Sequence, residues 1–195
     1  MFNPCSVIYV SSGGGNFLAQ ILTAHADKSK MKQITTSQDN NDYDGKWTNK
    51  ESIFDLHDDI DLSVSSNIER FEYLYKKSKI IFVSVQTDKD KEILKWRQMF
   101  LDNNMASPEV FKIRYQYHFE MKNYLDNKNI TYFDIPLNIF FDTHLFIKKL
   151  AGLKQYINLD LDDNLTRKMH KKWIKQNIKE RQMKVKELER RKNVS

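Results

Sequence analysis

The segment Lys79–Val85 limits the choice of fold more than any other part of the chain. It is a near-continuous apolar run that contains Ile80, Ile81, Phe82, Val83 and Val85. A strand that is apolar on both faces suits the interior of a parallel sheet that helices cover on both sides. We therefore expect a buried strand here, with helices packed against both of its faces.

Three further segments have the composition of strands, and helical patterns separate them. The predicted strands are Ser6–Val10, Ser52–His57 and Ile130–Ile135, the last closed by Pro136, which cannot donate a ladder hydrogen bond. The predicted helices are Asn16–Ala26, Asn67–Lys77, Asp88–Leu101, Pro108 to about Leu125, Asn138–Leu150 and a long basic one from about Asp162. Strands that alternate with helices indicate an α/β fold with a central, mainly parallel sheet and flanking helices.

Apolar spacing within the helices predicts which faces are buried. Phe17, Leu18, Ile21 and Leu22 lie on one face of the first helix. An apolar stripe at the start of the last helix consists of Leu165, Met169 and Trp173, with Ile174 and Ile178 as further candidates. The stripe thins out beyond Gln182, so we expect the first half of this helix to dock and the second half to meet solvent. Gly152 is well placed to end the helix before it. The polar stretch Asp27–Lys50 reads as a mobile surface loop.

Positive charge is concentrated at the C-terminal end. The net charge is +6, but Leu165–Lys192 holds twelve Lys or Arg against three Glu, a local charge of +9 that leaves −3 for the rest. We therefore divide the chain into an α/β domain, residues 1–178, and a basic helical extension, residues 179–195. Clustered cations of this kind bind nucleic acids or anionic membrane surfaces, and they also occur on helix ends that simply face water.

Several classes of protein are disfavoured. No apolar run approaches the ~20 residues that a membrane-spanning helix needs. Met1–Pro4 lack the basic and apolar regions of a secretory signal, and Cys5 is the single cysteine, so we expect a cytoplasmic protein without disulfides. The histidines on predicted helices (His25, His118, His144 and His170) look isolated, so we expect no metal site.

A glycine turn between the first strand and the first helix is the best candidate for a binding site. Backbone N–H groups and the positive end of a helix dipole together hold a phosphate or sulfate. The candidate anion-binding residues are Ser11, Ser12, Gly13, Gly14, Gly15, Asn16 and Phe17. The alternative is that these glycines only permit positive φ at the end of a strand.

Two common nucleotide-binding motifs do not fit this turn. The Lys and Ser/Thr of G-x-x-x-x-G-K-[ST] are missing, because Asn16 and Phe17 stand at the helix start, and the turn does not follow G-x-G-x-x-G. An ordinary kinase, an ATPase and a dinucleotide dehydrogenase are therefore disfavoured.

The order of these segments resembles the P-loop-like sulfotransferases, including short divergent members from bacteria and their viruses. Ile8–Leu18 is similar to the phosphosulfate-binding loop of that family, and Ile53–His57 to a strand that ends in the general-base histidine. Lys79–Val85 with Thr87–Leu94 resembles the region that binds the 3′-phosphate, and Ile130–Gly152 resembles a late strand and helix. The resemblance covers about residues 6–178.

This resemblance implies a P-loop-like sulfotransferase fold and 3′-phosphoadenosine 5′-phosphosulfate as co-substrate, with no metal. It makes His57 the catalytic base and a small-molecule or glycan hydroxyl the acceptor. Four departures concern charged and polar groups of the family: Ser12 replaces a loop lysine, Gly15 and Asn16 replace a Thr/Ser pair, Val85 replaces a strand-end arginine, and Ile93 stands where a serine is expected. The missing lysine and arginine favour one alternative, an inactive binding or assembly protein of the same fold. The basic C-terminal helix provides a second alternative, a binder of anionic polymers.

Overall fold

The computed structural model describes residues 5–9, 14–26, 54–58, 79–101 and 108–192. The strands are β1 (Cys5–Tyr9), β2 (Phe54–Asp58), β3 (Lys79–Ser84) and β4 (Tyr132–Pro136). The helices are α1 (Gly15–Ala26), α4 (Asp88–Leu101), α5 (Pro108–Asn127), the 3-10 helix η3 (Leu137–Phe141), α6 (Thr143–Ile157) and α7 (Asp163–Lys192). The predictions for Asp27–Lys50 and Asn67–Lys77 lie outside the described residues.

The four strands form one sheet in the order β2-β1-β3-β4, and all three neighbouring pairs are parallel. This arrangement confirms the predicted α/β class with a parallel central sheet. The register places Ile8 beside His57 on one side and beside Phe82 on the other. Parallel pairing brings the carboxyl ends of β1, β2 and β3 to the same edge of the sheet.

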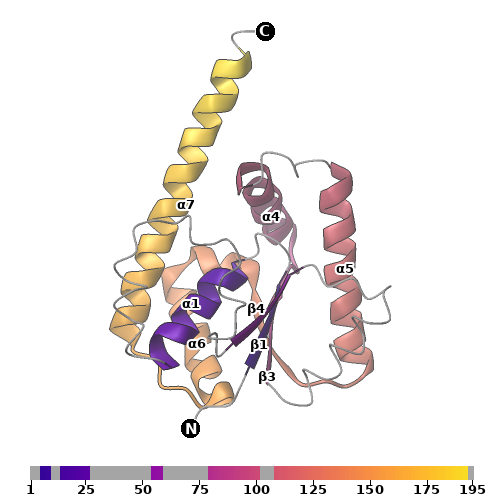
Figure 1. The fold of residues 1–195 in the computed structure, drawn as a ribbon, viewed down its shortest axis with the longest axis vertical. Helices are drawn as coiled ribbons and strands as arrows, with labels where there is room; N and C mark the ends of the chain where they lie inside the picture. Colours follow the sequence, from indigo (N-terminus) through magenta and orange to yellow (C-terminus); the bar gives the residue numbers. More distant parts are fainter. Residues whose placement is uncertain (1–4, 10–13, 27–53, 59–78, 102–107, 193–195) are drawn as a thin grey trace.

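Apolar side chains of β3 alternate between two buried layers. Ile81 and Val83 belong to a large cluster that includes side chains of α1, α4, α6 and α7, whereas Ile80 and Phe82 pack with Met121 of α5 and its neighbours. Figure 1 shows the same layers, with α1, α6 and α7 on one side of the sheet and α5 on the other. Burial on both faces explains why the sequence of β3 is apolar throughout.

The predicted helix Asn138–Leu150 is wrong in both of its boundaries. The chain forms η3 first, and α6 then begins after Asp142, whose side chain accepts a hydrogen bond from the Leu145 N–H at 2.9 Å. The helix passes through Gly152 and ends at Asn158, which has the left-handed φ of 54°. Gly152 instead allows a close approach of the Phe133 ring, 3.3 Å from where a Cβ would lie.

The first part of α7 docks through a face that is more polar than expected. Its buried residues are Thr166, His170, Trp173 and Asn177, whereas Ile178 is 52% exposed. The burial of Trp173 confirms that prediction, but Leu165 and Met169 are only half-buried. Hydrogen bonds and ring contacts allow the polar residues to take this face. In the described residues, no helix is long and apolar enough to cross a membrane.

Candidate functional site

The direction in which successive strands are added to the sheet changes between β1 and β3. The chain runs from β1 to β2 on one side, and β3 then lies on the other side of β1. In open parallel sheets, ligands bind outside the carboxyl ends of the strands at such a switch point. The carboxyl end of β1 and the Val85–Thr87 segment after β3 lie at this position, so the residues that follow both strands are candidates for ligand contacts.

Gly14 and Gly15 are buried where the turn enters α1. Gly14 has φ +85°, a conformation that favours glycine, and its carbonyl accepts a hydrogen bond from the Leu18 N–H at 3.1 Å. A Cβ at Gly14 would lie 3.2 Å from the Phe140 ring, and one at Gly15 would overlap the ring of Tyr9. Close packing therefore requires both glycines, whatever else the turn does.

The other predicted residues of the turn differ in how far they are described. Ser11, Ser12 and Gly13 lie outside the described residues, and Asn16 lies in the first turn of α1. The ring of Phe17 is 3% exposed and stacks on Trp173, with 4.7 Å between the ring centroids. Phe17 is thus a core residue, which leaves its backbone as the part that a ligand at the turn could meet.

His57 lies on the edge strand β2, beside Ile8 of β1. Only one residue, Asp58, follows it before the strand ends, so His57 is near the carboxyl edge of the sheet. Tyr9, the last residue of β1, pairs in register with Asp58. The backbone therefore brings the predicted base and the carboxyl end of β1 to the same edge of the sheet.

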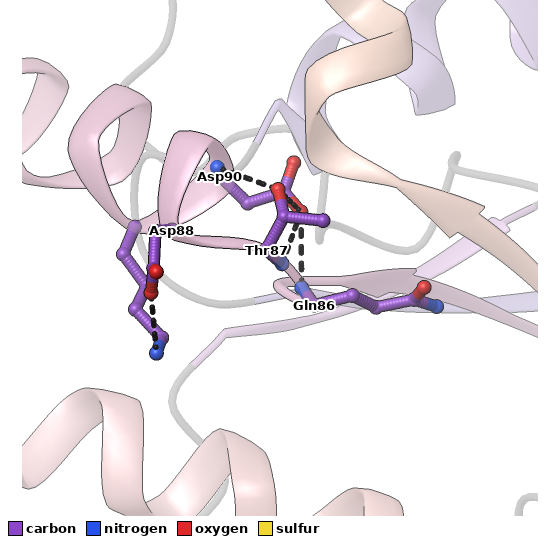
Figure 2. A network of polar contacts seen from close by, with 5 residues as sticks. Gln86, Thr87, Asp88 and Asp90 are labelled. Carbon is purple, nitrogen blue, oxygen red and sulfur yellow. Dashed lines mark hydrogen bonds and ion pairs between the residues drawn. The ribbon is translucent and has the colours of Figure 1, made fainter.

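After β3, a capping box formed by Thr87 and Asp90 begins helix α4, as Figure 2 shows. The Thr87 hydroxyl accepts a hydrogen bond from the Asp90 N–H at 3.2 Å. In return, Asp90 Oδ2 accepts from the Thr87 N–H and hydroxyl at 2.8 Å each, and from the Gln86 N–H at 3.1 Å. Reciprocal bonds of this kind satisfy backbone donors that the first turn of a helix leaves free.

Asp90 also joins two neighbouring loops. Its Oδ1 accepts a hydrogen bond from the backbone N–H of Asn138 at 2.6 Å, and its side chain is fully buried. A carboxylate of this chain therefore occupies the N-terminus of α4, where the resemblance predicts the site of a 3′-phosphate. Val85 and Ile93, which stand at the family's arginine and serine positions, are both buried in the apolar core.

A second polar cluster lies on the α5 face of the sheet. The side-chain amide of Gln86 donates to Ser84 Oγ at 2.9 Å and to Asp134 Oδ2 at 2.5 Å. Asp134 pairs in register with Phe82, and the His118 ring stacks on Phe82 at 4.6 Å. Burial lowers the pKa of His118 to about 4, so its imidazole is neutral and weakly basic at pH 7.

Three of the histidines on predicted helices are buried and contact backbone carbonyls or an aromatic ring. His25 contacts the carbonyls of Ile21 and Asp162, His118 is buried against Phe82, and His170 contacts the Phe140 carbonyl at 2.9 Å. Burial lowers the pKa of His170, an effect that this carbonyl opposes. Across the described ranges, no group of three or more His, Cys, Asp and Glu could hold a metal ion.

Lys89, Arg97 and Arg167 are three basic residues from which a replacement for the missing loop lysine could come. Lys89 and Arg167 are exposed. Arg97 is buried between α4 and α7, where its Nη1 donates to Asn177 Oδ1 and its guanidinium lies 5.0 Å from the Trp173 ring. Arg97 therefore contributes to the packing of these two helices.

The sequence reasoning missed the role of Asp90, although the spacing Thr87-x-x-Asp90 is a recognisable capping signal. It also missed the Ser84–Gln86–Asp134 cluster, which has no sequence signal because β3 and β4 are far apart along the chain.

Comparison with known proteins assigns no function to these residues: the chain has no significant match to a family model, a curated protein or a solved structure.

Proposed function

We propose that this chain is a sulfotransferase-like protein that binds a phosphosulfate or phosphate group at the glycine turn Ser11–Phe17. The observation that supports the proposal is the way the chain enters α1. Gly14, with φ +85°, directly precedes the N-terminus of this helix, which is the first element after the central strand β1. The first N–H groups of a helix have no partner within the helix, and the helix dipole favours a negative charge beside them.

The proposed reaction is sulfuryl transfer from 3′-phosphoadenosine 5′-phosphosulfate to an acceptor hydroxyl, on a small molecule or a glycan. The acceptor oxygen forms a new bond to sulfur, and the bond between sulfur and the phosphate oxygen breaks. The hydroxyl proton passes to His57, and adenosine 3′,5′-bisphosphate leaves with the electron pair. Backbone N–H groups of the turn stabilise the charge on the phosphosulfate, and a positioned base contributes ~10²–10⁴-fold to the rate.

A second candidate is a binding protein of the same fold without catalysis. Its support is the burial of Val85 and Ile93 in the core, together with the Asp90 carboxylate at the start of α4. In this candidate, the positions of the family's arginine and serine, Val85 and Ile93, offer neither a cation nor a hydroxyl to a 3′-phosphate. Fold does not determine function, so a sulfotransferase-like sheet is compatible with either candidate.

Calorimetric titration with adenosine 3′,5′-bisphosphate tests the anion site. We expect saturable binding that Ser12→Asp weakens at least tenfold, because the added carboxylate repels the phosphate. Ser12→Asn is the matched control, since it changes size similarly without adding charge, and binding should fall less than threefold. If millimolar nucleotide gives no binding to the unmodified protein, the phosphoadenosine-dependent function is wrong.

Catalysis needs a separate measurement. Radiolabelled phosphoadenosine phosphosulfate, incubated with phenolic and sugar acceptors, should yield a labelled ester that His57→Asn reduces by ~10²-fold or more. Nucleotide binding should survive this substitution. Binding without transfer to any of these acceptors would favour the non-catalytic candidate.

A further inference from the structure

The outer face of α7 carries a straight row of cations. These residues follow one another at helical intervals of four, three, four, seven and four: Lys168, Lys172, Lys175, Lys179, Lys186 and Arg190. All six are exposed. At 1.5 Å per residue, the row is about 33 Å long. We call it the basic row.

The basic row lies opposite the docked face of the helix. Lys168, Lys172, Lys175 and Lys179 each stand two positions after one of the buried residues Thr166, His170, Trp173 and Asn177. Two positions correspond to about 200° around the helix axis, because 3.6 residues complete a turn. The cations therefore point away from the sheet, and Figure 1 shows α7 continuing past α1 and α6 toward the C-terminus.

The charges of the basic row are not neutralised within the described part of the chain. The ion pairs there are formed by Lys91, Lys122 and Lys154, none of which belongs to α7. Glu180 of α7 has no member of the row three or four positions away, and Glu187 and Glu189 stand three positions from Arg190 and Lys186 at the far end of the row. Six aligned cations on a rigid support thus face solvent together, which creates a strong local positive potential.

We propose that the basic row binds the phosphate backbone of a nucleic-acid duplex. A duplex is a stiff rod of high charge density, and each phosphate that a lysine or arginine neutralises releases condensed counterions. The row contains no aromatic side chain on which an unpaired base could stack, which favours a duplex over a single strand. Recognition that uses backbone contacts alone does not depend on the base sequence.

The same observations disfavour the other polyanions. A helix that lies in a membrane surface inserts an apolar face between the lipids, whereas the face opposite the basic row docks onto the protein along Thr166–Asn177. The core of a protein–protein interface is rich in aromatic and other apolar side chains, and the row consists of five lysines and one arginine. The row therefore fits a phosphate backbone better than either surface.

Fluorescence anisotropy with a labelled 24-base-pair DNA duplex, and with an RNA duplex of equal length, tests the proposal on the full chain. The variant Lys172→Gln, Lys175→Gln, Lys179→Gln removes three charges from the row. The matched control, Lys95→Gln, Lys112→Gln, Lys148→Gln, removes three exposed charges from α4, α5 and α6. Far-UV circular dichroism verifies that both variants keep their helix content.

We expect the unmodified protein to bind at least one duplex in 50 mM salt and to lose about 10³-fold in affinity at 200 mM salt. The row variant should bind at least tenfold more weakly, with a log–log salt slope smaller by about 2.7, because each lost contact removes about 0.9. The control should change affinity less than threefold. Equal losses in the two variants, no saturable binding to either duplex, or tighter binding to single strands or phosphatidylserine vesicles would overturn the proposal.

Discussion

The carboxylate of Asp90 and the backbone N–H of Asn138 form a hydrogen bond of 2.6 Å across the carboxyl ends of β3 and β4. The same carboxylate caps α4 through Thr87 and Gln86. One buried acid therefore fixes both loops on this side of the switch point. A ligand at the glycine turn would meet a rigid surface here.

Replacing Asp90 tests this arrangement. Asp90→Asn exchanges one acceptor oxygen for a donor, which leaves at least one buried N–H group facing another donor. We expect the free energy of unfolding to fall by about 2 to 4 kcal/mol, measured by urea denaturation. Asp88→Asn makes the same chemical change at a side chain that is 96% exposed, and it should lose less than a third as much. Equal losses would contradict the role of Asp90.

Protonation of His118 should destabilise the fold in acid. Its pKa is about 4 in the folded protein and 6.5 as the ordinary value, because burial disfavours the charged ring. The unfolded state therefore binds the proton first. The free energy of unfolding therefore keeps its full value above pH 6.5. It falls by about 3 kcal/mol in total as the pH drops toward 4 and below.

The variant His118→Phe should remove this part of the pH dependence while keeping a ring against Phe82. Urea unfolding between pH 4 and 7.5 measures the free energy of unfolding of this variant and of the unmodified protein. His170 is present in both proteins, so its contribution cancels when the two curves are compared. His144→Gln, which removes an exposed imidazole, is the control for the loss of a histidine. Parallel stability curves for His118→Phe and the unmodified protein would show that His118 does not titrate as we expect.

Gly15 should tolerate no side chain. A methyl group there would overlap the Tyr9 ring, so Gly15→Ala should shift the strand or the helix and cost about 1 to 3 kcal/mol. Gly152→Ala, inside α6, should stay within about 1 kcal/mol of the unmodified protein, since better helix propensity offsets a tighter contact with Phe133. Thermal unfolding compares the two. A Gly15→Ala protein of undiminished stability would contradict the packing of β1 against α1.

The contact between Arg97 and Asn177 should hold α7 against α4. Asn177→Leu removes the acceptor of a buried guanidinium, so we expect a loss of about 2 to 3 kcal/mol. Asn177→Asp keeps the acceptor for Arg97 but places an oxygen opposite the Trp173 carbonyl, to which the amide donates at 2.8 Å, so it should recover only part of the loss. Gln176→Leu, at the half-buried neighbouring position, is the control. Hydrogen exchange along α7 should rise in Asn177→Leu, and unchanged exchange there would rule out this contact as the cause.

The pattern of apolar residues along the chain was enough to predict elements such as β3 and α4. The continuous apolar run of β3 predicted a strand that is buried on both faces, and Asp88–Leu101 is a helix over the residues predicted for it. The expected stop at Gly152 failed for a tertiary reason. The ring of Phe133 packs where that glycine lacks a side chain, and Asn158 takes the left-handed conformation that ends α6.

The sequence by itself determined the parallel α/β class, the glycines at the start of α1 and the number of cations in α7, because each depends on residue type and short-range spacing. Only the tertiary structure decided which face of α7 is buried. Thr166, His170 and Asn177 are polar, and their burial became favourable once partners such as Arg97 and the Phe140 carbonyl lay within hydrogen-bond distance. The same docking aligned the basic row toward solvent, and β-strand pairing brought His57 beside β1 at the carboxyl edge of the sheet.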